Sequence, residues 1–388
     1  MIIHPIIANY WIMLRHSFLT KMIALVILTS VCTPVSSLTM VSPTGTPTAS
    51  AAAKPAVAPA SKSTSTPTLI PTIARPALPV PYQTSLLNLL DKPHVYIQDP
   101  CQSLHDKWSP ANSAPGTVVM VIMFHKITDE TITDPNQISE YNFRQLMNTL
   151  HQDGFQAITT LQLAGFMEHN SKIPERSVLL VTDDKHPATY FNVLFHQYWI
   201  EYGWPVVNAW ISDDLTTADL WKQQEDLNAA GWVDYQAHGV ASIPITQDST
   251  DDTILGELKG SIEIFQQHFN KMPVAFIWPG GGFTPHAVGM ARQVGYRLGF
   301  TINPRGPLMF NWVPLADGGD PMRPTWIPEG PVNDPLMVLP RYWDTDAILH
   351  LDDVMQIGKD AAAYAQANKS TELDYYDTVC SPAYGALR

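Results

Sequence analysis

The chain has 388 residues, with 23 Lys+Arg against 36 Asp+Glu and a formal net charge of −13 at pH 7. This length accommodates one large domain with extensions. The acidic balance and the lack of any Lys/Arg cluster argue against nucleic acid as a partner, because binding to phosphates requires clustered cations. The 33 Pro residues exceed the average share of about 5%, and most of that excess lies near the amino terminus.

Residues 1–37 have the pattern of a secretory signal. Lys21 precedes an apolar run at 22–31, and Cys32 begins a stretch of small residues. A basic residue, an apolar run of about 7–15 residues and a small-residue exit are typical of signal peptides, and the run is shorter than the ~20 residues that span a bilayer. Because the preceding residues are also apolar, an uncleaved anchor in a membrane or envelope is the alternative. Both readings predict an extracytoplasmic protein, either secreted or held at the cell envelope.

Residues 38–82 are rich in Pro, Thr, Ser and Ala. Such a composition cannot bury enough apolar surface to offset the entropy of ordering the chain, so we expect a disordered linker. An O-glycosylated stalk is the alternative. The folded domain is then expected at 83–388.

Three cysteines are present. Cys32 lies in the expected signal, whereas Cys101 and Cys380 lie near the two ends of the expected domain. Domain termini often lie close together, and exported proteins meet oxidising conditions. We therefore predict a disulfide between Cys101 and Cys380, with two unrelated free thiols as the alternative.

The remaining sequence alternates between apolar runs and helical patterns. Strands are expected at 117–125, 155–158, 177–182, 205–211, 232–237, 274–278, 297–302 and 336–342. Helices are expected at 139–152, 160–168, 188–202, 217–230, 252–270, 285–293 and 345–357. This alternation predicts an α/β fold with a parallel sheet, and the number of units favours a closed barrel over an open sheet. The Pro- and Gly-rich stretch 303–334 is expected to be a loop over the rim or a surface excursion.

Polar residues follow several of the expected strands directly. They are His125, the pair Asp183 and Asp184, His238, and the turn at 278–281. Each has an ordinary structural explanation, such as a buried hydrogen-bonded His, a helix cap or a tight turn. Because the carboxyl ends of parallel barrel strands meet at one face, however, their coincidence predicts a functional site there.

The order and spacing of five motifs resemble those of the polysaccharide deacetylases. These are the NodB-type esterases of carbohydrate esterase family 4, and the similarity is greatest to the branch that acts on poly-N-acetylglucosamine. The motifs lie at 118–127, 143–155, 177–184, 237–242 and 277–281. The resemblance implies a distorted (β/α)7 TIM-like barrel and a substrate polysaccharide that contains N-acetylated amino sugars.

The resemblance also implies roles for individual residues. Asp183 would be the general base, and Asp184 and His238 would bind Zn²⁺ or another divalent metal. The residues expected to contact substrate are His125, Trp278, Pro279, Gly280 and Arg341. The metal would polarise the acetyl carbonyl and activate water for attack.

The sequence departs from the family at several of these positions. Ser242 stands where the family has its second metal-binding His, and Lys185 stands where it has Gly. His186 or Ser242 could serve as a replacement ligand. The segment 348–350 has the letters of the family's late general-acid motif, Leu-x-His, but falls in a helical pattern.

Two functions therefore remain open: a metal-dependent N-deacetylase of an envelope or extracellular polysaccharide, and a catalytically inactive relative that binds glycan or a protein partner. A glycosidase ranks below both, because Asp183 and Asp184 are adjacent in sequence and need not flank a glycosidic bond.

Overall fold

The computed structural model describes residues 77–387. Its main sheet is parallel, with the strand order β10-β9-β8-β7-β6-β2-β12, and a short strand β5 pairs with the first half of β6. The strands are β2 (Val118–Phe124), β5 (Gln156–Ala157), β6 (Arg176–Asp183), β7 (Val206–Trp210), β8 (Val233–Ala237), β9 (Ala275–Ile277), β10 (Leu298–Phe300) and β12 (Tyr342–Trp343).

The segment that ends in β12 closes this sheet into a barrel. Leu339 pairs in parallel with Phe300 of β10, and its backbone N–H donates to the Gly299 carbonyl at 2.8 Å. Three residues later, Tyr342 and Trp343 pair with β2 at the opposite edge of the sheet. One segment thus joins the two edges, and the expected seven-stranded α/β barrel is confirmed.

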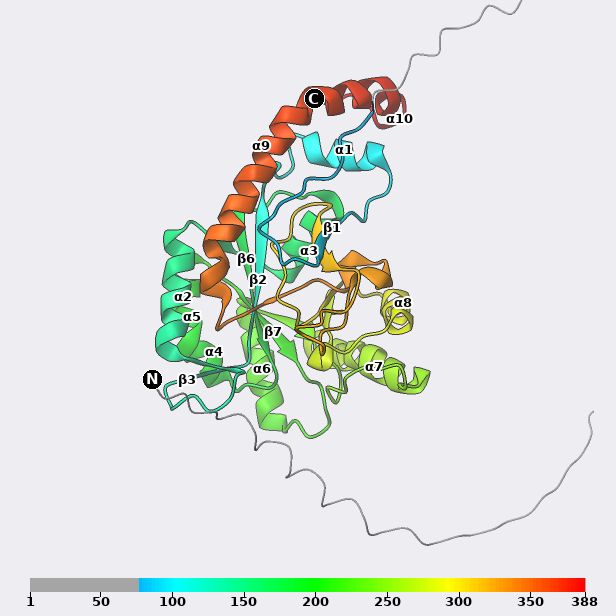
Figure 1. Ribbon diagram of the computed structural model, residues 1–388. Helices are drawn as coiled ribbons and strands as arrows, with labels where there is room; N and C mark the ends of the chain where they lie inside the picture. The colour runs from blue at the N-terminus through cyan, green and yellow to red at the C-terminus, as the bar shows by residue number, and fades with distance from the viewer. Residues whose placement is uncertain (1–76, 388) are drawn as a thin grey trace, which may run out of the picture. The chain divides into compact units, whose positions relative to one another are not determined.

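Helices alternate with the strands and surround them (Figure 1). They are α1 (Pro100–Trp108), α2 (Glu140–Gln152), α3 (Thr160–His169), α4 (Ala188–Leu194), α5 (His196–Tyr202), α6 (Ala218–Ala230), α7 (Asp251–Phe269), α8 (Pro285–Val294), α9 (Leu351–Tyr375) and α10 (Ser381–Tyr384). Several expectations differ. The helix at 188–202 is broken at Phe195, and the helix expected at 345–357 runs from Leu351 to Tyr375. The strand expected at 336–342 begins instead as a 3-10 helix at Pro335–Met337, and only Tyr342–Trp343 forms β12.

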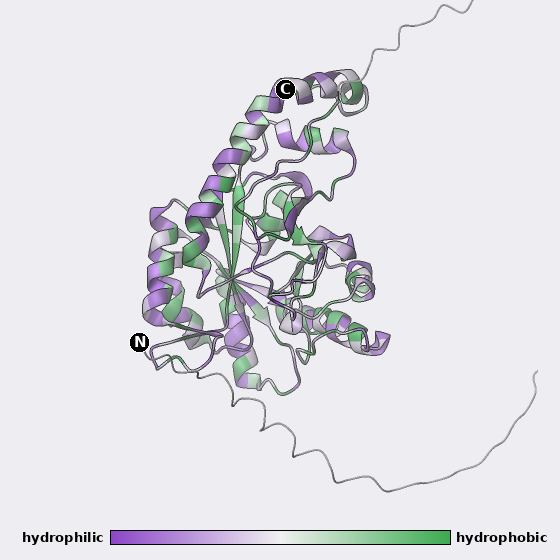
Figure 2. Cartoon of the chain, in the orientation of Figure 1, coloured by the Kyte–Doolittle hydropathy of each residue, from purple (hydrophilic) through white to green (hydrophobic). Residues whose placement is uncertain are grey.

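The apolar runs that predicted strands form the core. Every residue of β2 is buried, as required for a strand covered on both faces. Figure 2 shows hydrophobic colouring concentrated on the strands, while the helices carry hydrophilic residues on their outer faces. Helices such as α2 bury one apolar stripe against the sheet.

The Pro- and Gly-rich stretch runs largely at the amino-terminal end of the barrel. Leu308 pairs with Val119 near the start of β2, and residues 309–312 line a hollow together with Gly116 and Thr117. In the same stretch β11 (Val313–Ala316) pairs antiparallel with β1 (Asp91–His94), two strands that the sequence pattern did not predict. Residues 308–316 therefore lie away from the rim on which the polar strand ends meet, whereas Asn303 lies just past the carboxyl end of β10 and its carbonyl accepts from the Arg341 backbone N–H at 3.1 Å.

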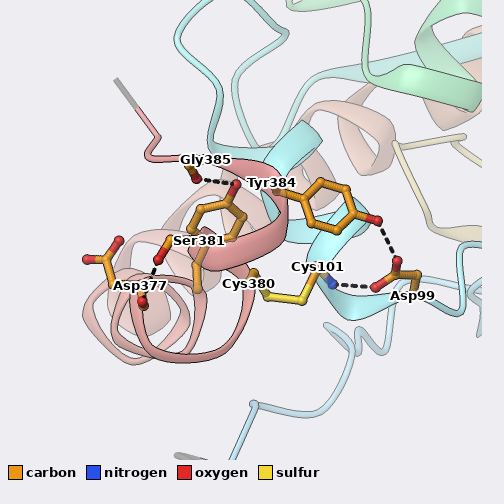
Figure 3. Close-up of a disulfide and its surroundings, with 8 residues drawn as sticks. Asp99, Cys101, Asp377, Cys380, Ser381, Tyr384 and Gly385 are labelled. Carbon is orange, nitrogen blue, oxygen red and sulfur yellow. Dashed lines mark hydrogen bonds between the residues drawn. A yellow bond between two sulfur atoms is a disulfide. The ribbon is translucent and has the colours of Figure 1, made fainter.

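The predicted disulfide is present. Cys101 of α1 is bonded to Cys380, which directly precedes α10. Figure 3 shows Asp99 beside it, where its carboxylate accepts from the Cys101 backbone N–H at 2.8 Å and from the Tyr384 hydroxyl at 2.6 Å. The bond and these contacts tie the first helix of the described domain to the last.

The packed domain begins before residue 83. The Val80 carbonyl accepts from the Tyr364 hydroxyl at 2.8 Å, and the Tyr82 carbonyl accepts from Trp312 at 2.9 Å. The expected linker thus ends earlier than 82. The expected signal at 1–37, with Cys32, and linker residues 38–76 lie outside the described residues. Within 77–387 no helix has the length and apolarity to cross a membrane.

Candidate active site

The carboxyl ends of the barrel strands bring the predicted polar residues together. Asp183 is the last residue of β6, and His125 follows β2, the strand beside it. His125 Nε2 lies 3.7 Å from Asp183 Oδ2. The carboxyl ends of parallel barrel strands meet at one rim, so this part of the site could be predicted from the sequence.

Arg341 also contacts the Asp183 carboxylate, through two nitrogens of its guanidinium. Its Nη1 and Nη2 donate to the two carboxylate oxygens at 2.7 and 2.9 Å, and its Nε donates to the Thr301 carbonyl at 2.7 Å. The Arg341 side chain is fully buried, so the predicted substrate contact is replaced by a contact with the predicted base. The fork geometry of guanidinium matches a carboxylate and fixes its orientation.

The charges around Asp183 keep it ionised. Burial alone raises the pKa of this carboxyl, but the positive charge of Arg341, followed by the effects of His238 and His125 and the hydrogen bond from Arg341, outweighs burial and holds the pKa well below its usual value. A carboxylate can accept a proton, whereas a carboxylic acid cannot. Asp183 is therefore in the protonation state that a general base requires.

His238 follows β8, and a backbone carbonyl of the neighbouring strand β9 orients its ring. Its Nδ1 lies 2.9 Å from the Ile277 carbonyl oxygen. A carbonyl can only accept, so Nδ1 carries a proton and donates to it. If His238 bound a metal through Nε2, this contact would orient the ring for that role.

Asp184 faces a polar pocket beside Asp183. The pocket has a volume of about 500 Å³ and is lined by His125, Lys126, Ile127, Asp134, Asn136, Gln137, Asp184, Lys185, His186 and Tyr190. Several of these residues belong to the small sheet of β3 (Lys126–Thr128) and β4 (Gln137–Ser139), which the sequence pattern did not predict. Asp184 is exposed and adopts a positive φ of 74°, a conformation that Asp tolerates better than most residues.

Lys185 forms an ion pair with Asp213. Its ammonium donates to Asp213 at 2.5 Å and to the Thr216 hydroxyl at 3.3 Å. The positive charge at the position where the family has Gly is therefore largely neutralised by Asp213.

His186 does not fit the role of replacement ligand. Its Nε2 lies 2.9 Å from the Asp183 carbonyl oxygen, and its ring stacks on Tyr190 with centroids 3.9 Å apart. Burial lowers the pKa of His186, so the ring is neutral and Nε2 donates. Nε2 is therefore not available to a metal, and only Nδ1 of this stacked ring could act as a ligand.

Ser242 lies in a loop organised by another residue. The backbone N–H groups of Ala241 and Ile243 donate to the buried carboxylate of Glu257, at 3.1 and 3.3 Å. Gly239 allows this, because at its positive φ a Cβ would collide with the Glu257 carboxylate. Ser242 itself has a φ of 55°. No hydrogen bond joins its hydroxyl to Asp184 or His238 in the part of the chain that the structure describes.

In the turn after β9, Trp278 belongs to the protein core and not to the surface. The Trp278 indole is fully buried and donates to the Met337 carbonyl at 2.8 Å, so its ring cannot stack on a sugar as predicted. Pro279 is also buried, whereas Gly280 is exposed with a φ of 55°.

The residues present do not complete a metal site. Catalytic zinc usually has three protein ligands and an open position. Asp184 and His238 are two candidate donors, but the third position holds Ser242. Across residues 77–387 no group of three or more His, Cys, Asp or Glu side chains is arranged to hold a metal ion.

Three residues near the site were missed by sequence reasoning. Tyr190 lines the pocket, Trp343 stacks on His125 with centroids 5.4 Å apart, and Asp344 follows β12. The rule that found Asp183 could have found Asp344, because Asp344 also follows a barrel strand directly. Tyr190 gives no such signal, since it lies within a helix.

Comparison with known proteins supports the resemblance seen in the motifs. The polysaccharide deacetylase family model matches residues 170–299, about a third of the chain. The Bacillus subtilis (strain 168) protein YxkH, which bears the name of a polysaccharide deacetylase, is 20% identical over 185 residues. That alignment covers 47% of this chain and 64% of YxkH.

Solved structures give weaker likenesses. The deacetylase PplD of Streptococcus pyogenes, solved with acetate, is 18% identical with a TM-score of 0.48 over 62% of this chain and 99% of its own. IcaB from Ammonifex degensii is 15% identical with a TM-score of 0.44 over 65% of this chain and 100% of its own. TM-scores below 0.5 leave these likenesses without weight for fold or substrate.

Proposed function

We propose that this chain, which carries a polysaccharide deacetylase domain, hydrolyses N-acetyl groups on a polysaccharide of N-acetylated amino sugars. The observation that supports this most directly is the Asp183 carboxylate, held by Arg341 at the rim of the barrel beside a polar pocket of about 500 Å³. The poly-N-acetylglucosamine class of glycan is the substrate that the motif resemblance favours.

The proposed reaction replaces a C–N bond by a C–O bond. Water attacks the acetyl carbonyl carbon while Asp183 accepts a proton from that water, and the amine leaves after gaining a proton. Both Asp183 oxygens bind Arg341, but each has a second lone pair with which it can accept. Because its pKa is low, Asp183 is a weak base, so the step needs accurate positioning more than basicity.

Aromatic residues offer a surface for the sugar. Trp343 is partly exposed and stacks on His125, and Tyr190 stacks on His186 at the pocket wall. Aromatic rings with one polar end are suited to surfaces that are partly wet. We propose that these two pairs contact the substrate in place of Trp278.

Metal dependence is a separate part of the proposal. Asp184 and His238 offer two donors for Zn²⁺, which would act as a Lewis acid on the acetyl oxygen. With the third position taken by Ser242, binding is expected to be weaker than in a site with three ligands.

The second candidate is a glycan- or protein-binding domain without hydrolysis. The incomplete donor set at Ser242 favours it, because the family chemistry depends on a bound metal. We further propose an extracytoplasmic location, since the signal-like sequence at 1–37 and the disulfide between Cys101 and Cys380 suit an oxidising compartment.

One experiment separates the two candidates. Acetate release from N-acetylglucosamine oligomers and binding of the same oligomers are measured on one preparation, with and without chelator. The deacetylase predicts release by the wild type that is lost in Asp183→Asn, with binding retained. Binding without acetate release under any metal condition would instead establish the non-catalytic domain.

A further inference from the structure

The loop that follows β10 contacts Arg341 at two places. The Thr301 carbonyl accepts from Arg341 Nε at 2.7 Å, and the Asn303 carbonyl accepts from the Arg341 backbone N–H at 3.1 Å. The other two guanidinium nitrogens donate to the Asp183 carboxylate. Because a guanidinium is planar and rigid, the position of the Thr301 carbonyl helps to set the plane in which Arg341 meets Asp183.

The buried side chain of Asn303 fixes this loop. Its carboxamide donates to Glu329 Oε1 at 2.5 Å and to the Ile327 carbonyl at 2.9 Å, and only 2% of Asn303 is exposed. Glu329 and Ile327 lie 26 and 24 residues further along the chain, in the Pro- and Gly-rich stretch. Asn303 thus ties the loop that contacts Arg341 to a distant part of that stretch.

Glu329 belongs to a buried ion cluster with Arg305 and Asp91. Arg305 Nε donates to both Glu329 carboxylate oxygens at 3.0 Å, and Arg305 Nη1 donates to Asp91 of β1. All three residues are buried. Such clusters are weak evidence for stability, because removing charges from water can cost more free energy than their attraction supplies. A hydrogen-bonded polar cluster does, however, make its surroundings rigid.

We propose that Asn303 is a positioning residue: held by the buried ion cluster, it places Arg341 so that the guanidinium orients the Asp183 carboxylate. Among the residues that the structure describes, Asn303 has no hydrogen bond to Asp183, and it does not line the pocket beside Asp184. It therefore acts through Arg341. The effect on catalysis rests on the proposed deacetylase function, whereas the link between Asn303 and the ion pair does not.

The first test measures whether Asn303 is coupled to the ion pair of Arg341 and Asp183. Asp183→Asn should lower the denaturation midpoint of the full chain, because it leaves the Arg341 charge buried without its partner. We expect this shift to shrink by about half in an Asn303→Ala background, since a displaced guanidinium no longer binds the carboxylate closely. Side chains without a link would give the same shift in both backgrounds.

Asn311→Gly is the matched control. Asn311 also ties the Pro- and Gly-rich stretch to the rest of the domain, because its side chain accepts from the Tyr96 and Ile97 backbone N–H groups at 2.9 and 2.8 Å. It lies beside the hollow at the amino-terminal end of the barrel, and glycine tolerates its φ of 51°. Asn311→Gly should lower the midpoint of the protein but leave the Asp183→Asn shift as in the wild type.

The second test measures acetate release from N-acetylglucosamine oligomers. In Asn303→Ala we expect kcat to fall about 10²-fold, as when a reacting group is displaced by about 1 Å. KM should stay at its wild-type value, because Asn303 does not line the pocket. Asn311→Gly should keep both kcat and KM, and equal losses of kcat in the two variants would show a purely structural role for Asn303.

An Asp183→Asn shift of equal size in wild type, Asn303→Ala and Asn311→Gly would overturn the inference, as would wild-type kcat in Asn303→Ala. If Asn303→Ala does not fold, Asn303→Ser replaces it in both tests, since it removes the carboxamide but keeps a hydrogen-bonding group. A wild type that releases no acetate overturns the proposed function alone. The denaturation midpoints, which need no substrate, then decide the inference about Asn303.

Discussion

Arg341 and Asp183 form a buried, two-pronged ion pair between residues 158 positions apart in sequence. The arginine comes from the segment that closes the barrel, and the aspartate ends the strand two places away across β2. The pair joins the expected catalytic base to the closure of the fold. Its loss should therefore affect both stability and chemistry.

Replacing the arginine tests the stability of the pair. Arg341→Met keeps much of the length but leaves the Asp183 charge buried without its partner, which typically costs about 3–5 kcal/mol. Equilibrium denaturation at pH 7 measures this loss. The double variant Arg341→Met/Asp183→Asn should recover part of it, because no buried charge then remains. A double variant as unstable as the sum of its parts would contradict the coupling.

Acid pH should remove the contribution of Asp183. Its pKa is lower in the folded protein than its unfolded value of about 3.9. The stabilisation is therefore complete above about pH 4 and is lost as pH falls toward the folded pKa. The free energy of unfolding of Asp183→Asn, measured against the wild type, should differ most near neutral pH and progressively less below about pH 4. A difference independent of pH would contradict the assignment.

Restoring the missing ligand should strengthen metal binding. Ser242→His adds a third donor at a positive φ that His tolerates, and even outer-sphere partners change metal affinity by about 10–100-fold. We expect at least a tenfold gain in Zn²⁺ affinity by calorimetry. Lys185→Gly is the control and should change little, because Asp213 already neutralises Lys185. Unchanged affinity in Ser242→His would show that Ser242 does not occupy the ligand position.

Two tryptophans should respond in opposite ways. Trp278→Ala empties a fully buried site and should cost about 3–5 kcal/mol of stability, without a selective effect on oligosaccharide binding. Trp343→Ala should weaken oligosaccharide binding at small cost in stability, because this ring is partly exposed beside His125. Denaturation and oligosaccharide titration of both variants check this. Wild-type binding in Trp343→Ala would remove it from the proposed sugar surface.

The disulfide should stabilise the domain substantially. It closes a loop with a sequence separation of 279 residues, and loss of a native disulfide typically costs about 2–5 kcal/mol. Cys101→Ser/Cys380→Ser should show such a loss in denaturant unfolding. Wild type treated with reductant and then alkylated should match the double variant in stability, and a reduced wild type as stable as the oxidised form would contradict the expectation.

The sequence predicted features that depend on local pattern. The buried run of β2 and the strand ends at Asp183 and His238 were all anticipated, because apolar runs and the polar residues that follow them are visible in the order of residues. The pairing of Cys101 with Cys380 was anticipated from their places near the domain ends.

Features that depend on long-range register were not visible. Whether the Arg341 side chain points at substrate or at Asp183 depends on how the closing segment aligns with β2, and a strand's two faces alternate with each residue. Because the face on which a side chain lies cannot be read from the sequence, Trp278 was expected to contact substrate at the rim, whereas its ring lies in the core. The β3–β4 sheet that lines the pocket consists of two three-residue strands, too short to produce a recognisable period.

The segment 339–343 is among the last parts of the domain to be synthesised, and it carries the side chain on which Asp183 depends. A chain that stops before it has the strand bearing the aspartate but neither a closed barrel nor a guanidinium to keep that carboxylate charged and oriented. The ion pair between Asp183 and Arg341 can therefore form only after residue 341 has been synthesised, and truncated chains that end earlier lack it.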